Sequence, residues 1–532
     1  MSLTFRMLTS LRPTEQRTAY RVAAGALLVL YLLAAWRSKG IWQFDEYFQQ
    51  LEPMSYRLGR IDHTELPWEF QSRIRPWLQP LLYWCVVAPA RALGATKPAT
   101  WWAICRWVSA LFGWVSVVTW ARSYASWFPS RASYRMALAC LVLCFFMPML
   151  HARTSSENLS GATMMLALGL LVGSTSLSPT GTPTSRRTEV PSVLRCMGVG
   201  VLLGCAFEFR YQVGIMVAGA LLWCLWYRRI PIRQLALVVA ALLACIAACW
   251  GLDAWGYHNW RVFPAVGYVR FNLVQDGAAS FGTSPWFAYF EMVVEFATPP
   301  IGVFLLVCFG ILWVTQPSNL LTWVTLPFFI VHCAIGHKEV RFLFPALYFA
   351  PTVAALSVRS IYRWLRSGPR VRRVRWFIVT ASLLCLVATD LFLLVRATML
   401  PLEDKFVVQE KVDELYSPGE QLFTGLGQNP FEYGNLTVDF YGAPELKWTK
   451  LKAVGDVFPL LERKAAGPAL LWLSAADYKA STGKLPARCH RVWASREGTS
   501  KVSLWIEKVF GAQYLPREDT CLLQCGPSQG RT

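Results

Sequence analysis

Long apolar runs, separated by short polar segments, alternate along the first 400 residues of the chain. A helix that crosses a bilayer needs about 20 apolar residues, so this pattern predicts a bundle of about eleven to twelve membrane-spanning helices. The expected spans are residues 22–36, 76–93, 100–120, 134–150, 159–176, 196–227 (two short helices), 234–254, 299–315, 320–335, 343–358 and 376–396.

Basic residues mark one end of these predicted helices. Arginines gather in residues 1–21 and in three connecting segments, 184–195, 228–233 and 359–375. Lys and Arg concentrate in the cytoplasmic loops of membrane proteins, so we expect all four segments to be cytoplasmic. The run 22–36 is not followed by a cleavage site and is expected to remain as the first span.

The remaining loops then fall on the opposite side of the membrane. They are the first outer loop 38–75, the segment 255–298, the short link 336–342 and the stretch after about residue 400. Between residues 76 and 195 the number of predicted crossings disagrees with the positions of the basic residues. If every apolar run crosses the membrane, the segment 177–195 lies outside, although its arginines indicate the cytoplasmic side. One run in this region is therefore expected not to be a full crossing.

The net charge and the metal-binding residue types exclude two other classes. Lys and Arg outnumber Asp and Glu by 52 to 32, a formal net charge of +20. Nucleic-acid-binding proteins are also basic, but these arginines lie in short loops between apolar runs, so no nucleic-acid partner is expected. The six histidines are scattered and no Cys-x-x-Cys pair occurs, so neither a metal nor another cofactor is expected.

The chain after residue 400 contains no run long enough to span a membrane. Short alternating pieces at 470–473 and 502–506 predict strands, so we expect a small mixed α/β domain on the outer side. Cys489, Cys521 and Cys525 lie in this polar region. Two of them can form a disulfide if the region is extracytoplasmic, and the sequence leaves the pairing open.

Asp45 and Glu46 begin the first outer loop, directly beyond the first predicted span. A carboxylate at the membrane surface is partly desolvated and can act as a general base near neutral pH. An acidic pair that only marks the loop is the simpler alternative.

Two aromatic and charged stretches also face outward. Residues 66–80 contain Trp68, Glu69 and Arg75, which suit either an interfacial belt or the binding of a lipid phosphate. Residues 252–290 place polar groups beside aromatic rings, which is how proteins hold sugars and is also typical of an aromatic belt. The candidate residues of this second stretch are Asp253, Tyr257, Trp260, Asn272 and Trp286.

The link between two later spans carries four ionisable side chains, His337, Lys338, Glu339 and Arg341. Charges packed so closely between spans are unusual in a membrane protein. Their natural partner is a phosphate at the membrane surface, because arginine offers a planar fork of donors and histidine a further donor. A hairpin turn that is merely polar is the alternative.

Two further polar sites lie in apolar surroundings. Residues 153–158 join two predicted spans, and Glu208 and Arg210 lie within another apolar run. Glu208 and Arg210 have opposite charges, so a structural ion pair is as good an interpretation as a role in a cavity.

These motifs, in this order, resemble the mannosyltransferases that use dolichyl-phosphate mannose (glycosyltransferase family 22), and most of all the branch with the GPI-anchor enzymes of the PIG-B type. The resemblance covers about residues 20–400. It rests on Phe44-Asp45-Glu46-Tyr47-Phe48-Gln49, on Trp68-Glu69-Phe70 with Arg75, on Asp253 through Trp286, on His337-Lys338-Glu339-x-Arg341-Phe342 and, more weakly, on 153–158. One departure is Gln43-Phe44, where the family often has His-Pro.

The resemblance implies a fold and a domain organisation. It implies an all-α polytopic bundle of the GT-C glycosyltransferase type, formed by residues 22–400, with a cytoplasmic N-terminus at 1–21. Residues 401–532 would form the extracytoplasmic mixed α/β domain. The active site would lie on the luminal or periplasmic side, in the endoplasmic reticulum membrane of a eukaryote or the plasma membrane of a bacterium.

The resemblance also implies a metal-independent inverting reaction. Asp45 would accept the proton of an acceptor hydroxyl as it attacks the anomeric carbon, and Glu46 would bind the acceptor or support Asp45. Arg341 and His337, together with Lys338, would stabilise the departing phosphate. The other candidate residues of the outer loops would bind the substrates.

The expected function is therefore transfer of mannose from a dolichyl- or polyprenyl-phosphate donor to a glycolipid acceptor related to a GPI precursor. Transfer of another polyprenyl-linked sugar and a non-enzymatic lipid or solute transporter are the alternatives. Transporters carry ionisable groups near the bilayer midplane and show internal repeats, whereas these clusters lie at span ends and no repeat is visible. The sequence leaves the acceptor open.

Overall fold

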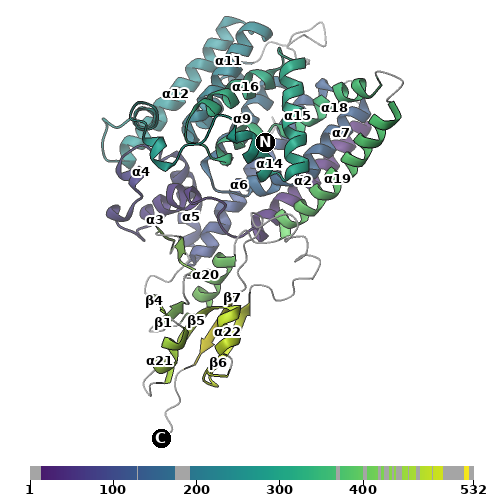
Figure 1. Cartoon of the computed structure of the whole chain (residues 1–532). Coiled ribbons are helices and arrows are strands. Elements are labelled where there is room, and N and C mark those ends of the chain that lie inside the picture. The colour runs from purple at the N-terminus through teal and green to yellow at the C-terminus, as the bar shows by residue number, and fades with distance from the viewer. Residues whose placement is uncertain are drawn as a thin grey trace. The chain divides into compact units, whose positions relative to one another are not determined.

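The computed structural model describes residues 14–128, 130–173, 192–366, 372–399 and, between 404 and 526, the segments 404–416, 421–424, 430–433, 436–438, 446–452, 454–462, 468–481, 483–494 and 520–526. The expected strand at 502–506 and most of the arginine-containing segment 184–195 lie outside these residues. The chain divides into two compact units. The larger one is helical, and the smaller one contains a sheet (Figure 1).

Helices account for the chain before residue 400. The α-helices are α2 (Thr14–Arg37), α3 (Glu52–Arg57), α4 (Trp68–Gln71), α5 (Leu78–Ala92), α6 (Pro98–Ser123), α7 (Arg131–Leu143), α8 (Phe146–His151), α9 (Ser156–Val172), α10 (Val193–Phe209), α11 (Gly214–Trp223), α12 (Ile232–Gly256), α13 (Pro264–Val269), α14 (Ala288–Phe296), α15 (Pro299–Thr315), α16 (Leu320–Ala334), α17 (Phe344–Leu347), α18 (Ala350–Arg366) and α19 (Arg372–Met399).

Only part of this helical chain consists of long straight spans. Among the described residues, α2, α6 with the turn that follows it, α12 and α19 are each long and apolar enough to cross a membrane. The pairs α15–α16 and α17–α18 pass the same test together but are bent by 116° and 60°. The apolar run 196–227 forms two short helices, as predicted, because the backbone is extended at Arg210 between α10 and α11.

Two of the arginine-containing segments, 184–195 and 228–233, meet at the end of α9. Arg195 Nε donates to the carbonyl of Leu170 at 2.9 Å, and Arg228 Nη1 donates to the carbonyl of Leu171 at 2.6 Å. These carbonyls belong to the last turn of α9, which helix geometry leaves without intrahelical partners. Both basic side chains therefore cap the C-terminal end of α9.

Helix α5 accounts for the mismatch between the predicted crossings and the arginines. It contains 15 residues, about 22 Å, which is shorter than a bilayer core of about 30 Å. Residues 39–42, which follow α2, and residues 91–102, which follow α5, fold together in the smaller unit. The end of the run 76–93 and the segment that follows α2 therefore belong to one compact unit, which favours this run as the one that is not a full crossing. With α5 removed, the loop at 122–135 and its arginines join the other basic turns.

The smaller unit is a five-stranded mixed sheet with short helices. The strand order is β4-β1-β5-β7-β6, in which β1 is parallel to β4 and β5, and β7 is antiparallel to β5 and β6. The strands and helices of this unit are β1 (Gln421–Thr424), β2 (Glu432–Tyr433), β3 (Leu436–Thr437), β4 (Lys447–Lys450), β5 (Ala469–Ser474), β6 (Cys489–Ala494), β7 (Thr520–Cys525), α20 (Asp404–Leu415), α21 (Phe458–Glu462) and α22 (Ala475–Ser481).

Both faces of this sheet are covered, which explains the apolar run in its central strand. Side chains alternate between the faces of a strand. In β5, Leu470 and Trp472 pack in one core cluster with Val408 and Val412 of α20, while Leu471 and Leu473 pack in another. The run at 470–473, predicted to be a strand, is therefore buried on both sides.

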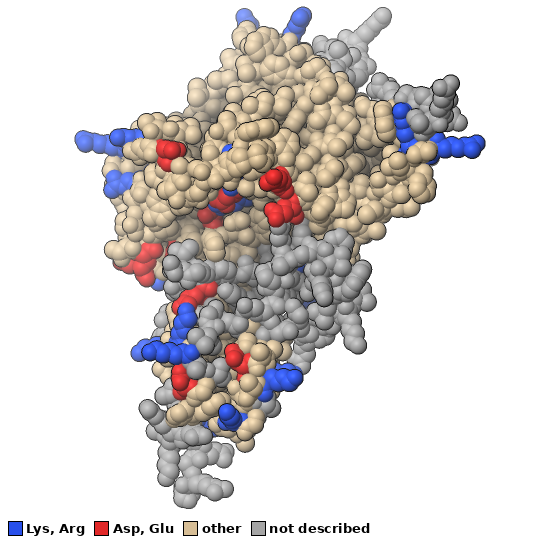
Figure 2. All heavy atoms as spheres, viewed as in Figure 1, with Lys and Arg blue, Asp and Glu red and all other residues tan. Residues whose placement is uncertain are grey.

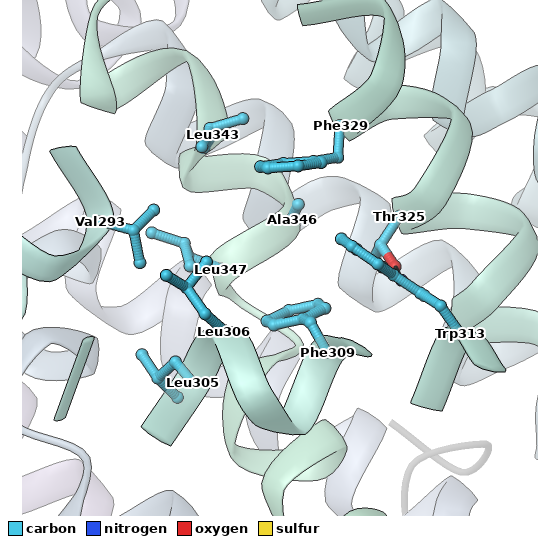
Figure 3. Close-up of a pocket in the computed structure, with 10 residues that line it drawn as sticks. All are labelled: Val293, Leu305, Leu306, Phe309, Trp313, Thr325, Phe329, Leu343, Ala346 and Leu347. Atoms are coloured by element: carbon cyan, nitrogen blue, oxygen red, sulfur yellow. Dashed lines mark hydrogen bonds between the residues drawn. The ribbon is translucent and has the colours of Figure 1, made fainter. Parts of the chain in front are cut away.

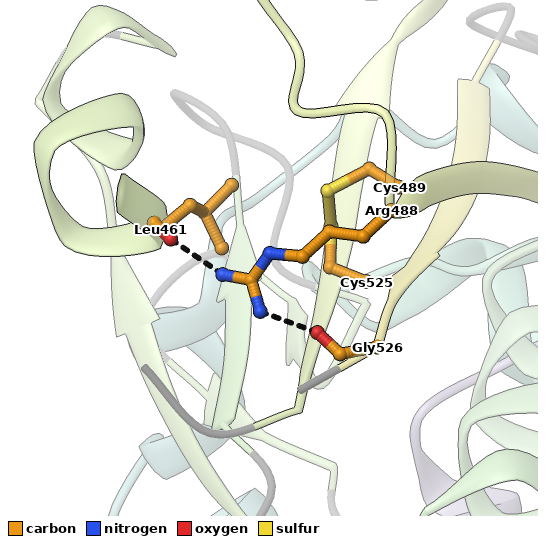
Figure 4. The surroundings of a disulfide bond; sticks show 5 residues. All are labelled: Leu461, Arg488, Cys489, Cys525 and Gly526. Carbon is orange, nitrogen blue, oxygen red and sulfur yellow. Dashed lines mark hydrogen bonds between the residues drawn. A yellow bond between two sulfur atoms is a disulfide. The ribbon is translucent and has the colours of Figure 1, made fainter. Parts of the chain in front are cut away.

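A disulfide joins Cys489 of β6 to Cys525 of β7, at directly opposed positions of the antiparallel pair (Figure 4). Arg488 lies beside it and donates from its two terminal nitrogens to the carbonyls of Leu461 and Gly526. Cys521 is buried and is not part of this disulfide. The structure thus selects one pairing among the three cysteines of this region.

Replacing Cys489 with serine is expected to destabilise this unit by about 2–4 kcal/mol, since the bond closes a loop of 36 residues in the unfolded chain. Urea unfolding followed by tryptophan fluorescence in the sheet measures the effect. Cys521→Ser is the matched control, because it removes a thiol without removing the cross-link. Equal stability of the Cys489 variant and the parent would contradict the prediction.

Candidate active site

Asp45 and Glu46 begin a helical stretch that continues through a π-helical turn, η1 (Tyr47–Leu51), into α3. Two acidic residues suit the positive N-terminal end of a helix. The two carboxylates point in different directions. Glu46 is 1% exposed and accepts hydrogen bonds from the amide and the hydroxyl of Thr154 at 3.0 and 3.2 Å. Asp45 remains 21% exposed at its side chain and forms an ion pair with Arg341.

Arg341 lies in a single-turn helix, η8 (Val340–Leu343), that leads into α17. Its guanidinium binds Glu339 in a fork, with Nε at 2.7 Å from Oε2 and Nη2 at 2.8 Å from Oε1. His337 Nε2 lies 3.1 Å from the same carboxylate. Lys338 turns the other way, toward the carbonyls of Ser284 and Ile335. Three of the four ionisable groups predicted here are therefore joined, because Glu339 contacts both His337 and Arg341.

Close packing of α17 against α9 brings Arg341 to this position. A Cβ on Gly161 of α9 would lie 2.4 Å from the ring of Tyr348, so only glycine permits the approach. The Tyr348 hydroxyl donates to Asn158 at 2.6 Å. The segment 153–158 and the segment 337–342, far apart in sequence, are thereby held side by side.

Arg75 reaches the same region from the first outer loop. Its Nε donates to Glu69 Oε1 at 3.0 Å, and the other oxygen of Glu69 accepts from Gln49 at 2.9 Å. Arg73, two residues earlier, has a left-handed backbone with φ of 59°. Such strain in a non-glycine residue is characteristic of functional segments, where the surrounding structure holds it. The Tyr257 hydroxyl donates to the Arg75 carbonyl at 2.5 Å and fixes the turn.

The charges of three arginines lower the pKa of the Asp45 carboxyl. Each of these arginines also forms an ion pair with a glutamate. Arg75 pairs with Glu69, Arg341 with Glu339, and Arg210 with Glu157. Burial alone would raise the pKa of Asp45, but the charges of Arg341, Arg75 and Arg210 hold it below its ordinary value of 3.8. The pKa of Glu339 is likewise lowered, since the hydrogen bonds and charge of Arg341 outweigh burial. Asp45 is thus ionised at neutral pH.

Asp253, at the end of α12, is buried and accepts a hydrogen bond from the backbone amide of Trp77 at 2.7 Å. Trp77 packs with Phe70 and Tyr257 in a small apolar cluster. This carboxylate therefore ties the end of α12 to the start of α5, beneath the turn that holds Arg75.

Replacing Asp253 with leucine leaves the Trp77 amide buried without a partner, which is expected to cost about 1–3 kcal/mol. Asp253→Asn retains an acceptor oxygen at the same position and is expected to behave nearly as wild type. Thermal unfolding in detergent, with transfer activity measured in parallel, distinguishes the two. Equal damage from both changes would mean that the charge of Asp253 matters, as expected of a group that binds substrate.

A series of packed aromatic side chains connects the first outer loop to His337. The ring of Trp68 lies 5.2 Å from Phe271 and 5.9 Å from Phe281, and the ring of Phe281 lies 5.9 Å from His337. These centroid distances are typical of packed aromatic pairs. The first outer loop (38–75) and the segment 255–298, which is the second outer loop, are therefore joined beside the charged groups.

Other predicted residues of the second outer loop lie elsewhere. Trp260 is 67% exposed and meets Trp250 of α12, and Trp286 is 65% exposed beside two phenylalanines of its own segment. Asn272 donates to the backbone carbonyl of Tyr268 at 2.9 Å. The structure does not place these three side chains beside Asp45.

Sequence reasoning did not commit to three residues that the structure places in this cluster. Glu157 belongs to the weaker family motif at 153–158, and Arg210 was expected to pair with Glu208 or to line a cavity, whereas the structure pairs Arg210 with Glu157. The burial of both charges is the signal that singles them out. Phe281 gave no signal, because one phenylalanine among many does not identify its neighbours.

An apolar cavity of about 30 Å³ lies apart from these charges, between α14, α15, α16 and α17 (Figure 3). Thr325 supplies its one hydroxyl, which accepts from the indole of Trp313 at 3.0 Å. The cavity is too small and too apolar for a sugar substrate.

The charged cluster, by contrast, combines a base with anion-binding groups. In the space-filling view, acidic and basic atoms lie together in a hollow on the otherwise mostly uncharged face of the helical unit (Figure 2). A partly exposed carboxylate can accept a proton, and convergent guanidinium groups can stabilise a negative charge that develops nearby. This combination suits the attack of a hydroxyl on a carbon that bears a phosphate leaving group.

Comparison with known proteins agrees with this chemistry. Residues 24–415 match the model of the Alg9-like mannosyltransferase family. The chain belongs to this family. The resemblance seen in the motifs is therefore confirmed, and the chain is a member of a family of membrane-embedded mannosyltransferases.

Several relatives carry related names. The chain is 26% identical over 365 residues to GPI mannosyltransferase 3 of Yarrowia lipolytica, which covers 63% of this chain and 64% of the relative. It is 24% identical over 417 residues to GPI mannosyltransferase 3 of Aspergillus fumigatus, covering 69% and 52%. A probable Dol-P-Man:Man(7)GlcNAc(2)-PP-Dol alpha-1,6-mannosyltransferase of Schizosaccharomyces pombe is 27% identical over 175 residues, covering 32% and 31%. The chain thus matches less than two thirds of the length of each.

The fold is also found among solved structures. The crystal structure of ArnT from Cupriavidus metallidurans bound to undecaprenyl phosphate superposes with a TM-score of 0.50 over 94% of this chain and 97% of that chain, at 12% identity. ArnT has the GT-C fold. The predicted class, a GT-C helix bundle with a small C-terminal sheet domain, is confirmed.

Proposed function

We propose that this member of the Alg9-like family is an inverting mannosyltransferase that moves mannose from a dolichyl- or polyprenyl-phosphate donor to a glycolipid acceptor. The observation that carries the proposal is the ion pair between Asp45 and Arg341, within reach of two further arginines. A base and a phosphate-binding group in contact are what a displacement at a phosphate-bearing carbon requires.

In the proposed reaction, the acceptor hydroxyl attacks the anomeric carbon of mannose from the face opposite the phosphate. Asp45 takes the hydroxyl proton as the new carbon–oxygen bond forms. The bond between the anomeric carbon and the phosphate oxygen breaks, and its electron pair leaves with the lipid phosphate, which gains one negative charge. A β-linked donor then gives an α-linked product. Arg341 and His337 stabilise the charge on the departing phosphate.

The remaining residues of the cluster have supporting roles in this proposal. Glu46 positions Asp45 through Thr154, and Glu339 orients both Arg341 and His337. Glu69 orients Arg75 at the edge of the site. Trp68 and the phenylalanines packed on it offer apolar faces on which a sugar ring can stack.

Lipid-linked precursors of two kinds are the candidate acceptors. Several of the relatives are named GPI mannosyltransferase 3, whereas the Schizosaccharomyces relative acts, by its name, on a lipid-linked oligosaccharide. The match to the latter covers only 32% of this chain. We therefore propose a GPI-precursor-like acceptor first.

The test uses membranes that contain the full-length chain and labelled dolichyl-phosphate mannose. A GPI precursor, a lipid-linked oligosaccharide and no acceptor are supplied in parallel, and labelled dolichyl-phosphate glucose replaces the mannose donor as a control. Label in the GPI precursor from the mannose donor alone is the expected result. Transfer from the glucose donor instead, or passage of a labelled lipid across the bilayer without transfer, would replace the proposal with one of its alternatives.

The pH dependence follows from the lowered pKa of Asp45. Because the arginines hold this carboxyl below 3.8, it is ionised from pH 7 down to about pH 4. We expect kcat/KM, which reports the free enzyme, to show no acidic decline above about pH 4. A bound phosphate adds negative charge and competes for Arg341, so it raises the pKa of Asp45, and kcat should decline at a higher pH than kcat/KM. Coincident acidic declines would contradict the assignment of Asp45.

We further propose that the site faces the lumen of the endoplasmic reticulum in a eukaryote, or the periplasm in a bacterium. The arginine-capped end of the bundle is then cytoplasmic. The disulfide between Cys489 and Cys525 supports an oxidising compartment for the smaller unit. That unit also contains residues 39–42, directly before Asp45 in the chain.

Labelling of sealed vesicles tests the orientation. Trp260→Cys exposes a thiol in the second outer loop, and Arg229→Cys exposes one in the basic turn before α12. A membrane-impermeant maleimide added outside sealed, right-side-out microsomes should label the second variant above the wild-type background, and the first only after detergent is added. The reverse pattern would overturn the proposed sidedness.

A further inference from the structure

Arg210 is a buried cation that has no role in the reaction proposed above. It is 4% exposed and lies at the break between α10 and α11, where an extended backbone with φ of −152° ends α10. Its Nη2 lies 3.1 Å from Glu157 Oε1, and Glu157 is fully buried. An ionised pair at this depth is costly, and in membrane proteins such pairs mark functional sites.

Arg210 and Arg341 are neighbours, although 131 positions separate them in the sequence. Both guanidinium groups approach one oxygen of Glu157, Arg210 at 3.1 Å and Arg341 at 3.8 Å. Both also lie over the ring of Phe342, at 5.1 and 5.3 Å from its centroid. Glu157 and Phe342 thus hold two positive charges close together against their mutual repulsion.

The two guanidinium groups can bind another anion once Asp45 leaves Arg341. Asp45 must release Arg341 to face the acceptor hydroxyl, and the two guanidinium groups then share Glu157 and Glu339 but lack the Asp45 charge. Arg210 Nε is buried and has no hydrogen-bond partner among the residues that the structure describes. A buried donor without a partner, close to a carboxylate that moves away, suits a site that binds a charged group during the reaction.

We infer that Arg210 is a second phosphate-binding residue of this site, which contacts the donor's phosphate beside Arg341 while Glu157 positions both guanidinium groups. The inference rests on the proposed function and extends it. The phosphate becomes doubly charged when its bond to the anomeric carbon breaks, and two arginines match two charges better than one. Arg210 also acts on the Asp45 charge, which accounts for its place among the three arginines.

A structural ion pair is the competing explanation, and neutral replacement of both partners separates the two. Removing one partner leaves a buried charge unpaired and destabilises the fold, whereas replacing both by uncharged residues of similar size is commonly tolerated. Two double variants serve this purpose, Glu157→Leu with Arg210→Met and Glu157→Gln with Arg210→Gln. The better folded of the two, judged by thermal unfolding, is used.

The experiment uses full-length protein in phosphatidylcholine nanodiscs. It measures the Kd for dolichyl monophosphate, the leaving group, together with kcat and KM for dolichyl-phosphate mannose. Arg261→Met, on the exposed second outer loop, is the matched control for loss of one arginine. We expect the double variant to bind dolichyl monophosphate about 10- to 100-fold more weakly and to lose at least as much in kcat/KM, while the control is unchanged.

The outcomes separate this inference from the function on which it rests. A folded double variant with the wild-type Kd and wild-type kcat/KM would show that Arg210 and Glu157 are structural, and the inference would be overturned while the transferase stands. A wild-type protein that transfers no mannose would refute the proposed function. In that case, Arg210-dependent binding of dolichyl monophosphate would still support the phosphate site.

Discussion

Replacing Asp45 with asparagine is expected to reduce mannose transfer by about 10²- to 10⁴-fold, which is the usual contribution of a general base. The amide has nearly the shape of the carboxylate but accepts no proton at neutral pH. Since Asp45 is 21% exposed at its side chain and lies at the start of a helical stretch, the change should leave the fold intact. Initial rates with labelled dolichyl-phosphate mannose measure the loss.

A second measurement on this variant distinguishes a lost base from a damaged site. The neutral amide that replaces the carboxylate would no longer neutralise Arg341, so the variant should bind dolichyl monophosphate at least as tightly as wild type. Glu46→Gln is the comparison, because Glu46 is buried on Thr154 and its loss acts on stability first. Near-wild-type turnover of the Asp45 variant would rule out Asp45 as the base.

Replacing Arg341 with methionine should have the next largest effect, a loss of about 10²- to 10³-fold in kcat/KM. The side chain supplies the fork that binds Glu339 and the ion pair with Asp45, so its loss removes the proposed phosphate contact and frees both carboxylates. The pKa of Asp45 should rise, because Arg341 is the first of the three charges that lower it. An acidic decline in the residual kcat/KM should then appear at a higher pH than in wild type.

Arg341→Lys tests the geometry of this contact. Lysine keeps the charge but not the planar fork, so activity should fall between the wild-type and methionine values. Arg270→Met, on the exposed part of the second outer loop, removes an arginine without touching the cluster and serves as the control. Wild-type donor KM in the methionine variant would argue against phosphate binding at Arg341.

The motifs that predicted this site are short stretches of neighbouring residues. The run from His337 to Arg341 was recognisable because four ionisable residues between two apolar runs are rare in a membrane protein unless they bind a ligand. In the structure, Glu339 contacts both His337 and Arg341. Asp45 stood out by its place after the first span. Neither signal required knowledge of the fold, since both are breaks in a hydrophobic pattern.

Other expectations depended on contacts that no local pattern reveals. Trp260 and Trp286 matched the same aromatic pattern as Trp68, yet they are two-thirds exposed, whereas Trp68 packs on Phe271 and Phe281. The apolar run at 76–93 was expected to be a span, although the helix α5 that it forms has only 15 residues. Hydropathy indicates whether the surface of a helix can face lipid, but it does not show on which side of the membrane each end of the helix lies.

The sequence by itself determined that the chain crosses a membrane, which loops are basic and which short segments carry the charges, because apolar runs and their interruptions are properties of neighbouring residues. Only the tertiary structure decided that Glu157 joins Arg210 to Arg341, that Glu46 is held by Thr154 while Asp45 is not, and that Cys489 pairs with Cys525. These contacts join residues separated by 36 or more positions. They follow from helix packing, such as the approach of α17 at Gly161, and packing depends on the whole chain.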